Sequence, residues 1–416
     1  MASDSPRDPP PSDDELLGRS KRRGHLKVVD SDSPFLLRAA RLPIASTLPP
    51  RPWLYGTQLL RGFLSLLVAP GGTGKSLYAM GVMASLAAGR RLLDQHIFER
   101  VNTAYINLED PLDELERRMA AFQIRHNIGK DELQGHFWLN SGDERELSIA
   151  RVADDGSEIV HPDVEALIRA INDHQLGALA VDPFAETHEL EENSNPQMIR
   201  AAKAWRSVAR ATGCAILLVH HLRKGPADGI DSARGAKALT DSARVALLMS
   251  PMSETDAAEL GIEKDESGHY VRLDNAKANM SVRACKASWY ELAQVDLHNG
   301  TAIYPHGDSV AAIVSWEPPS VFGDLTVIQC NEGLDRIAAG PRDGVRYTSS
   351  RRGDGARWAG KVLVDLFGVT DVVAARMIGV WIKSGVLRET PYRDPEQRRD
   401  RLGLVVDDLK RPGTVV

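Results

Sequence analysis

The sequence is poor in features that mark several classes of protein. Its three cysteines, Cys214, Cys285 and Cys330, are far apart and in no metal-ligand spacing. This favours reduced, buried thiols in a cytoplasmic protein over a disulfide scaffold or a zinc site. The 416 residues carry a net charge of −6, so the chain has no global basic signature. Any contact with nucleic acid must therefore come from local patches.

Long apolar runs and internal repeats are also missing. The longest apolar run, residues 63–70, is far too short to span a bilayer, and the amino-terminal residues show no apolar signal-peptide region. We therefore expect no membrane contact and no secretion. Hydrophobic residues make up 43% of the chain and charged residues 26%, as in ordinary soluble globular proteins. The length allows one large domain with a small one, or two ordinary domains.

Residues 1–35 are rich in Pro, Asp and Ser and are predicted to be a disordered tail. Further along the chain, short apolar runs alternate with helical patterns, and this alternation predicts βαβ units and a mostly parallel sheet. The expected strands are 62–69, 103–108, 178–182, 215–221 and 245–250, and the expected helices are 76–88, 113–126, 161–174 and 195–212. Two further runs extend this domain, taken as residues 36–305.

Residues 321–416 show a different pattern after a linker over 306–320. Three helical patterns are followed by a two-stranded wing around a charged turn. The pattern of the whole chain therefore predicts the α/β class with a mostly parallel sheet, plus a small C-terminal winged-helix-like domain.

The segment "GGTGKS" follows an expected strand and opens an expected helix, which is the setting of a phosphate-binding loop. Glycines let backbone N–H groups turn onto phosphate oxygens, the lysine reaches the β- and γ-phosphates, and the serine hydroxyl can ligate Mg²⁺. Ala69 stands where the usual pattern begins with Gly, a position that only shapes the strand exit. The nucleotide-binding residues predicted are Gly71, Gly72, Thr73, Gly74, Lys75, Ser76 and Leu77, with ATP and Mg²⁺ as ligands.

Three expected strands end in residues that suit hydrolysis. Asp182 can hold the Mg²⁺ water shell, Glu109 can polarise the attacking water, and His220 and His221 can sense the γ-phosphate. Ligands of open α/β sheets bind at the carboxyl ends of strands, so these residues are expected at one edge. Taken alone, each residue also has a simpler interpretation. Asp182 could be a turn residue, Glu109 a surface acid and either histidine a structural residue.

The segments "VAPGGTGKS", "YINLEDPLDELERRM", "LAVDPFAETHELEENSNP", "ATGCAILLVHHLRKG", "ARGAKALTDSARVALLM" and "NAKAN" resemble RecA-type ATPases. They are most similar to the plasmid-encoded RepA-like hexameric replicative helicases, often labelled AAA family ATPases. The resemblance covers residues 50–285, leaves the C-terminal module outside, and implies that the α/β core is a RecA-like P-loop NTPase core.

The resemblance implies a role for each matching residue. Lys75 and Ser76 fall on the nucleotide and Mg²⁺ positions, Glu109 on the general base, Asp182 on the second acidic motif and His221 on the phosphate sensor. Arg244 falls on an arginine finger that enters the neighbouring subunit's site, and Lys277 on a second basic position of that kind; Arg118 falls near the nucleotide base. Related helicases often carry Lys-x-Arg at Lys277, whereas Asn279 stands here, so the finger is assigned to Arg244. An ion pair between Arg244 and Asp241 is the alternative.

Two basic regions are candidate nucleic-acid contacts. The glycine-rich segment 222–241 carries Arg223, Lys224, Arg234 and Lys237 without an aromatic residue, which suits phosphate tracking on single-stranded DNA. In the C-terminal module the candidates are Arg351, Arg352, Arg376 and Lys383, because a winged helix can place such a helix in the major groove. Exposed loops with ordinary charges, and protein contacts, are the competing interpretations.

The leading hypothesis is a ring-forming, ATP-driven motor on single-stranded DNA that serves as the helicase of a plasmid, phage or integrated element. Its expected partners are further copies of itself, in a hexameric ring, and initiator or primase proteins. A RecA-type ATPase that loads or remodels proteins without unwinding, and a DNA-binding regulator switched by ATP, are the alternatives. A pure switch needs no water activator, so the presence of Glu109 and Arg244 argues against the regulator.

Overall fold

A computed structural model describes residues 37, 39–40, 42–156, 159–221, 234–281, 287–351 and 355–413. For residues 234–237 and 259 only the backbone is described. The chain divides into two compact units, residues 1–50 and 51–416. In the first unit, the described part holds one 3₁₀ turn, Ala45–Thr47. The tail predicted over residues 1–35 lies outside the described residues.

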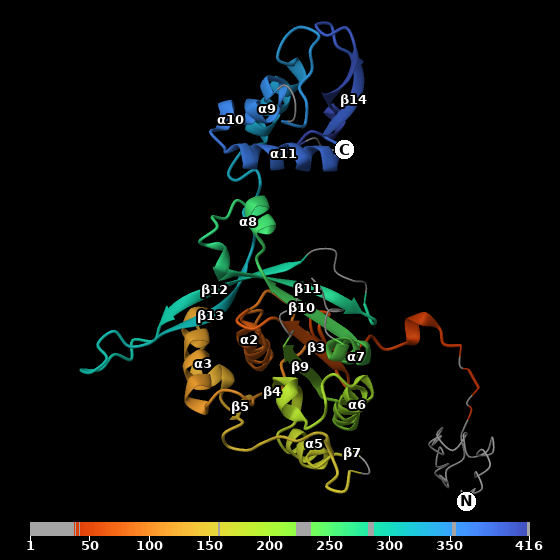
Figure 1. Ribbon diagram of the computed structural model, residues 1–416, viewed down its shortest axis with the longest axis vertical. Coiled ribbons are helices and arrows are strands. Elements are labelled where there is room, and N and C mark those ends of the chain that lie inside the picture. Colours follow the sequence, from red (N-terminus) through yellow and green to blue (C-terminus); the bar gives the residue numbers. More distant parts are fainter. Residues whose placement is uncertain are drawn as a thin grey trace, which may run out of the picture. The chain divides into compact units, whose positions relative to one another are not determined.

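The second unit is built on a nine-stranded sheet (Figure 1). Its strands run in the order β13-β12-β11-β10-β3-β9-β8-β4-β5, and neighbours are parallel from β10 to β5. All six residues of β3 are buried, because helices cover both faces of this part of the sheet. The parallel strands are β3 (Leu64–Ala69), β4 (Asn102–Asn107), β5 (Phe137–Ser141), β8 (Leu176–Asp182), β9 (Ala215–His221) and β10 (Val245–Pro251).

Helices on the two faces of the sheet pack two separate cores. On one face are α2 (Lys75–Ala88), α3 (Leu112–His126) and α4 (Lys130–Leu133), and on the other are α5 (Val164–Asp173), α6 (Asn195–Thr212) and α7 (Arg234–Ser242) (Figure 1). The α6 helix ends at Gly213 in the left-handed conformation, as its sequence predicts. The α/β class with a mostly parallel sheet is thereby confirmed.

The antiparallel side of the sheet reaches further along the chain than expected. It consists of β11 (Tyr270–Ala278), β12 (Ser288–Asp296) and β13 (Ser309–Trp316). The linker predicted over 306–320 thus contains an edge strand of the central sheet. The alanines of "SVAAIVSW" weaken the strand signal in the sequence, and pairing with all of β12 overrides it.

Several short elements surround the sheet. These are the two-stranded ribbons β1 (Trp53–Tyr55) with β2 (Leu59–Leu60) and β6 (Arg151–Val152) with β7 (Ile159–Val160), and the helix α8 (Glu254–Leu260). No helix in the described part of the chain is both long enough and apolar enough to cross a membrane.

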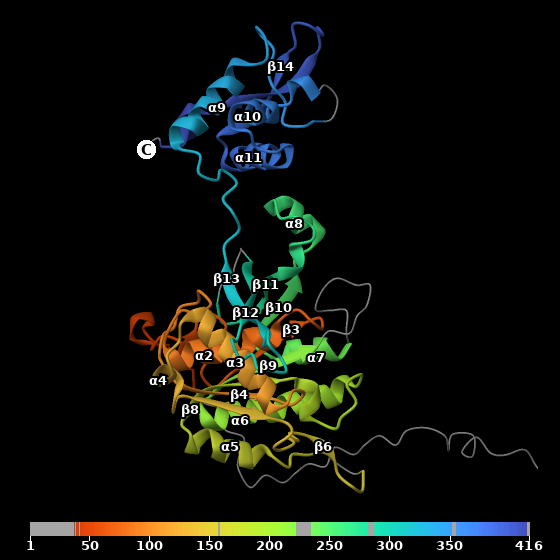
Figure 2. The same ribbon diagram turned by 90° about the vertical axis from the view of Figure 1, so that its left-hand side faces the viewer.

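The C-terminal module packs its own core from three helices and one antiparallel ribbon (Figure 2). Leu334, Leu363 and Trp381 are buried at its centre. Leu387, the first residue of the ribbon, is fully buried against this core. The elements are α9 (Val327–Ala339), α10 (Gly360–Phe367), α11 (Asp371–Ser384), β14 (Leu387–Arg393) and β15 (Asp400–Val406).

Candidate functional site

The loop between β3 and α2 has the backbone form of a phosphate cradle. Gly72 and Gly74 adopt φ values of 78° and 76°, which residues other than glycine rarely reach. A Cβ at Gly71 or Gly72 would meet no atom within 4 Å, so this side of the loop is open to a ligand. Thr73 donates a hydrogen bond of 2.8 Å from Oγ1 to the Pro70 carbonyl, which closes the loop. The loop therefore has room and free N–H groups for phosphate oxygens at a helix N-terminus.

Lys75, the first residue of α2, is only 6% exposed. Burial lowers the pKa of its ammonium group, and the charges of Asp182, Glu109 and Asp110 act in the opposite direction. These acids come from the ends of β8 and β4, so the fold does bring the predicted lysine and carboxylates together. Ser76 follows Lys75 and lies next to the Tyr105 hydroxyl.

Asp182, at the end of β8, is fully buried. Its Oδ2 accepts a hydrogen bond of 2.9 Å from the Tyr105 hydroxyl, while its Oδ1 has no hydrogen-bond partner among the described residues. A buried carboxylate oxygen without a donor fits the water shell of a cation, as Mg²⁺ keeps several waters when it binds nucleotide phosphates. The donor set therefore fits Mg²⁺ held by Ser76, Asp182 and the phosphates of ATP.

Asn107 organises the loop that carries Glu109, a role that sequence reasoning missed. Its Oδ1 accepts hydrogen bonds from the backbone N–H groups of Glu109, at 3.0 Å, and Asp110, at 2.7 Å. Its Nδ2 donates to the Tyr105 hydroxyl at 3.1 Å. Burial, followed by the charge of Asp182, raises the pKa of Tyr105, which keeps the phenol protonated as a donor. The Mg²⁺ aspartate and the Glu109 loop are thus joined through two buried side chains.

Glu109 and His221 face each other at this edge. Their Oε1 and Nε2 atoms are 3.6 Å apart, and the glutamate side chain is 46% exposed, so water can reach it. His221 pairs with Ala69 across the β3–β9 ladder, at the point where the phosphate loop begins. A histidine between the loop and the acid is placed to link phosphate occupancy to the position of Glu109.

Arg118 does not extend freely toward a nucleotide base. Its guanidinium forms two hydrogen bonds with Asp110, of 2.7 and 3.2 Å, and one of 3.0 Å with Glu114. Burial opposes its charged form, but these partners raise the pKa of Arg118 overall. The arginine therefore holds the residue beside Glu109, and its predicted contact with the base stays a prediction.

Arg244 and Lys277 lie at the opposite, amino edge of the parallel sheet. The Arg244 N–H donates to the carbonyl of Leu64, the first residue of β3, whereas the phosphate loop follows the last. Since a strand rises about 3.3 Å per residue, roughly 15–20 Å separate Arg244 from its own loop. Arg244 is exposed and forms no ion pair with a described residue, Asp241 included. Arg244 therefore lies far from the phosphate loop of its own chain.

Lys277 is committed to its own subunit. Its Nζ donates hydrogen bonds of 2.9 Å to the carbonyls of Thr240 and Asp241, at the end of α7. Burial lowers the pKa of Lys277, the Asp241 charge opposes this, and the nearby Arg244 adds to the lowering. In this structure Lys277 caps a helix beside the candidate finger.

Comparison with known proteins supports the nucleotide site. Residues 32–227 match the sequence profile of the family described as an AAA domain. This segment includes the phosphate loop, Glu109, Asp182 and His221, and with the site geometry it supports a RecA-type P-loop ATPase. A solved structure, a KaiC-like protein from the hyperthermophilic archaeon Pyrococcus horikoshii, aligns with 64% of this chain and 99% of its own at 15% identity, with a TM-score of 0.40.

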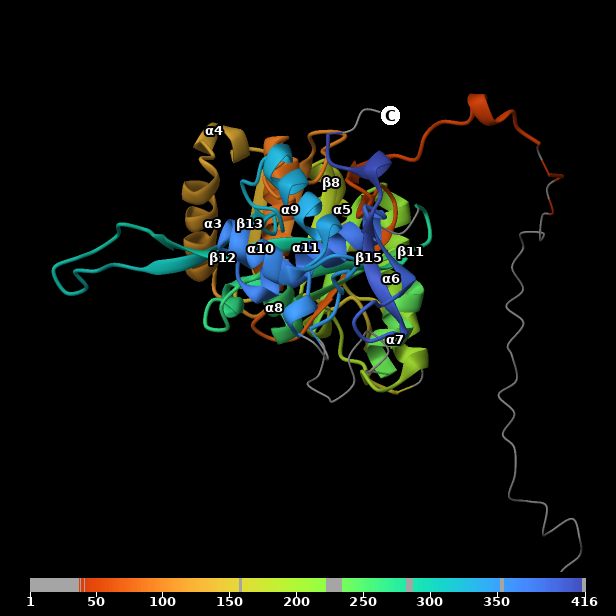
Figure 3. The ribbon, with the colours of Figure 1, turned by 90° about the horizontal axis from the view of Figure 1, so that it is seen from above.

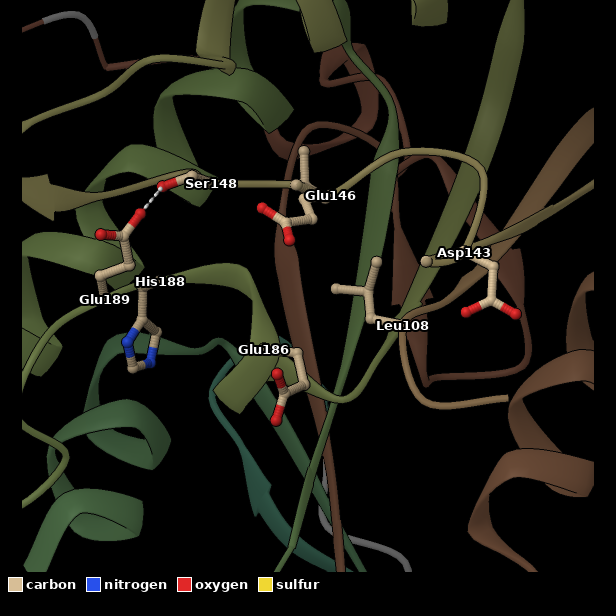
Figure 4. Close-up of a pocket in the computed structure, with 9 residues that line it drawn as sticks. Leu108, Asp143, Glu146, Ser148, Glu186, His188 and Glu189 are labelled. Atoms are coloured by element: carbon tan, nitrogen blue, oxygen red, sulfur yellow. Dashed lines mark hydrogen bonds between the residues drawn. The ribbon is translucent and has the colours of Figure 1, made fainter. Parts of the chain in front are cut away.

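An acidic cavity opens beside the nucleotide site (Figure 4). It has a volume of about 390 Å³ and starts at Leu108, next to Glu109. Ser148 donates a hydrogen bond of 3.3 Å to Glu189, and the remaining acids around the cavity are Asp143, Glu146 and Glu186. Such a surface repels a phosphate backbone and attracts cationic groups. The sequence pattern did not reveal it, because its acids come from two separate loops.

The predicted nucleic-acid residues are only partly described. Arg223, Lys224 and Arg352, and the side chains of Arg234 and Lys237, lie outside the described residues, and α7 begins at Arg234. Arg351 forms an ion pair of 2.7 Å with Asp371 and stacks over Trp358.

On α11, Lys383 is exposed and Arg376 half-buried. The ribbon after α11 adds basic residues that were missed, although "YRDPEQRRDR" signals four of them: Arg393, Arg398, Arg399 and Arg401. Arg388, at the start of the ribbon, is a fifth.

Proposed function

We propose that this chain is an ATP-hydrolysing, ring-forming RecA-type motor acting on single-stranded DNA, as a replicative helicase of a plasmid, phage or integrated element. The observation that carries the proposal is the position of Arg244. Its guanidinium is exposed and unpaired among the described residues and lies at the amino edge of the sheet, while Lys75, Asp182 and Glu109 gather at the carboxyl edge. A phosphate site on one edge and an exposed arginine on the other suit two neighbouring copies that complete each other's site.

Each residue then has a defined part in hydrolysis. The loop N–H groups and Lys75 bind the phosphates of ATP. Glu109 orients the attacking water and accepts its proton, and Arg244 of the next copy stabilises the charge that develops on the transferred phosphoryl group. Bound Mg²⁺ would neutralise charge on the β- and γ-phosphates. Because the finger comes from another copy, turnover depends on assembly.

The C-terminal module is proposed as a winged-helix domain that contacts the DNA backbone. Three helices followed by an antiparallel ribbon match that arrangement. The outward face of α11 offers Val372, Gly379 and Val380 with only Lys383 as an exposed cation, which gives few donors for base edges. The arginines of β14 and β15 are better suited to phosphates, so the ribbon is the expected contact.

The acidic cavity favours a second candidate function, a RecA-type ATPase that remodels or loads proteins without unwinding DNA. Carboxylates next to the Glu109 loop would receive lysine or arginine side chains of a protein client in preference to DNA. In that case ATP turnover would respond to a basic polypeptide and would ignore single-stranded DNA.

The ATPase rate of the purified chain, measured with and without single-stranded DNA and alongside its mass in solution, tests these functions. A ring stimulated by single-stranded DNA supports the motor. A monomer with DNA-independent turnover contradicts it. Stimulation by duplex alone would favour a DNA-binding regulator, and stimulation by a basic protein alone would favour the remodelling ATPase.

A further inference from the structure

The hairpin formed by β12 and β13 ends in a tip, residues 297–308, that presents two large apolar side chains to solvent. Ile303 is 80% exposed and Tyr304 is 71% exposed. The tip is held by internal hydrogen bonds, two between Asn299 and Asp308, of 2.7 and 2.8 Å, and two between Thr301 and Tyr304, of 2.9 and 3.0 Å. A loop closed in this way keeps both side chains pointing outward, as apolar anchor residues of a protein interface must.

The charge of the hairpin disfavours a nucleic acid as its partner. No Lys or Arg occurs from residue 287 to residue 320, while Glu291, Asp296 and Asp308 lie along the hairpin. Phosphate backbones are bound through cations, so this hairpin repels them. The partner surface must instead combine an apolar pocket with basic residues.

A cavity of about 450 Å³ between β7, α5 and α6 has this combination. Ile159, Val164 and Ala204 supply its apolar lining, and Arg200 and Lys203 stand at its rim. Both cations are exposed, and neither forms an ion pair within the described part of the chain. The cavity therefore offers apolar contact and two unpaired positive charges.

The tip and the cavity belong to opposite faces of the sheet. The hairpin lies along α3, where Arg117 Nε is 3.4 Å from Asp308 Oδ2 and His126 Nε2 is 2.8 Å from the Ile313 carbonyl. The cavity belongs to the face covered by α5 and α6. Figure 3 shows the hairpin projecting past α3, away from α6 and α7. An apolar tip on one face and a complementary cavity on the other allow a head-to-tail contact between copies, which is the type of contact that builds rings.

We propose that Ile303 and Tyr304 dock into the α5–α6 cavity of a second copy of this chain, with the hairpin acids facing Arg200 and Lys203. This contact rests on the ring-forming part of the proposed function and names the surfaces that hold the ring together. It involves neither the phosphate loop nor Arg244.

The first test compares the solution mass of the full chain with that of a variant carrying Ile303→Ser and Tyr304→Ser. Because buried aromatic and aliphatic anchors dominate interface energies, self-association should weaken by about 30-fold or more. Ile328→Ser, which removes an apolar side chain of equal exposure in the C-terminal module, is the matched control and should leave the mass unchanged. An unchanged mass in the hairpin variant overturns the proposal.

Cross-linking tests the pairing itself. In a Cys285→Ser background, Tyr304→Cys is placed in one preparation and Ser207→Cys, which lines the cavity, in another. Cys214 and Cys330 are buried and should not react. Oxidation should join subunits only when the two preparations are mixed. Cross-linking within the Tyr304→Cys preparation would mean a tip-to-tip contact, and no cross-linking in the mixture would mean no contact; either result overturns the proposal.

A third measurement separates this contact from the catalytic proposal. Arg200→Glu with Lys203→Glu should lower the mass and the turnover together, and turnover should return at high protein concentration. Arg244→Ala should keep the mass and lose the turnover at every concentration. If the charge-reversed variant keeps its mass but loses stimulation by DNA, the cavity rim binds DNA and the docking proposal fails.

Discussion

At the carboxyl edge of the parallel sheet the polar side chains are buried and tied to one another, whereas at the amino edge the principal cation is exposed and unpaired. Asp182, Tyr105 and Asn107 form one hydrogen-bonded chain that ends at the Glu109 loop. Arg244 has no such support among the described residues. Preorganised groups suit binding and water activation within one subunit, while a free guanidinium suits a partner that arrives from outside. This difference is what the proposed site shared between copies requires.

The largest effect is expected at the carboxyl edge, from Glu109→Gln. The amide keeps the shape of the side chain but cannot take a proton from water, so turnover should fall by roughly 10³- to 10⁴-fold while ATP binding stays within a few-fold. Turnover and nucleotide affinity measured separately check this. Glu116→Gln, which changes an exposed glutamate on α3, the helix that follows the Glu109 loop, is the control. Turnover within tenfold of the parent would remove Glu109 from the chemistry.

Arg244→Ala breaks the amino edge and should reduce turnover by about 10³-fold without loss of ATP binding. Mixed with Lys75→Ala, which is defective at the carboxyl edge, it should recover about a quarter of the parent activity, because random neighbours in a ring form one intact interface in four. Arg210→Ala, which replaces an exposed arginine near the same edge, should leave turnover unchanged. No recovery on mixing would mean that Arg244 does not act across an interface.

A smaller effect should follow from Tyr105→Phe, which removes the one side-chain donor to Asp182 among the described residues. We expect the Mg²⁺ concentration for half-maximal turnover to rise about tenfold, as when the partner of a metal ligand is removed. Tyr78→Phe is the matched control, because it also removes a buried tyrosine hydroxyl, which donates a hydrogen bond of 2.6 Å to Gln58. An equal Mg²⁺ shift in both variants would show a general loss of packing instead.

The smallest effect is expected from Lys277→Met. Loss of two hydrogen bonds at the end of α7 should lower the free energy of unfolding by about 1 kcal/mol, and turnover by less than tenfold. Denaturant unfolding and steady-state turnover measure both, with Lys130→Met as an exposed control. A turnover loss equal to that of Arg244→Ala would instead give Lys277 a direct catalytic part.

Much of the core was predictable because its signals are local. The α6 helix covers the predicted range 195–212, and β9 covers 215–221, since apolar periodicity and a glycine stop act within a few residues. The edge strand β13 was missed because its own residues carry a weak pattern and its pairing with β12 decides it. The tip residues Ile303 and Tyr304 gave no signal either, as apolar residues are usually interpreted as core.

The sequence by itself determined the phosphate loop, because a run of consecutive residues between a buried strand and a helix contains all that a phosphate cradle requires. It also determined the acids that end β4 and β8, since strand ends can be read from short apolar runs. Only the tertiary structure decided that Tyr105 and Asn107 connect those acids, that Lys277 caps α7, and that Arg244 lies at the edge opposite its own loop. These relations depend on strand order and register, which join residues as far apart in sequence as Tyr105 and Asp182 and which no local pattern contains.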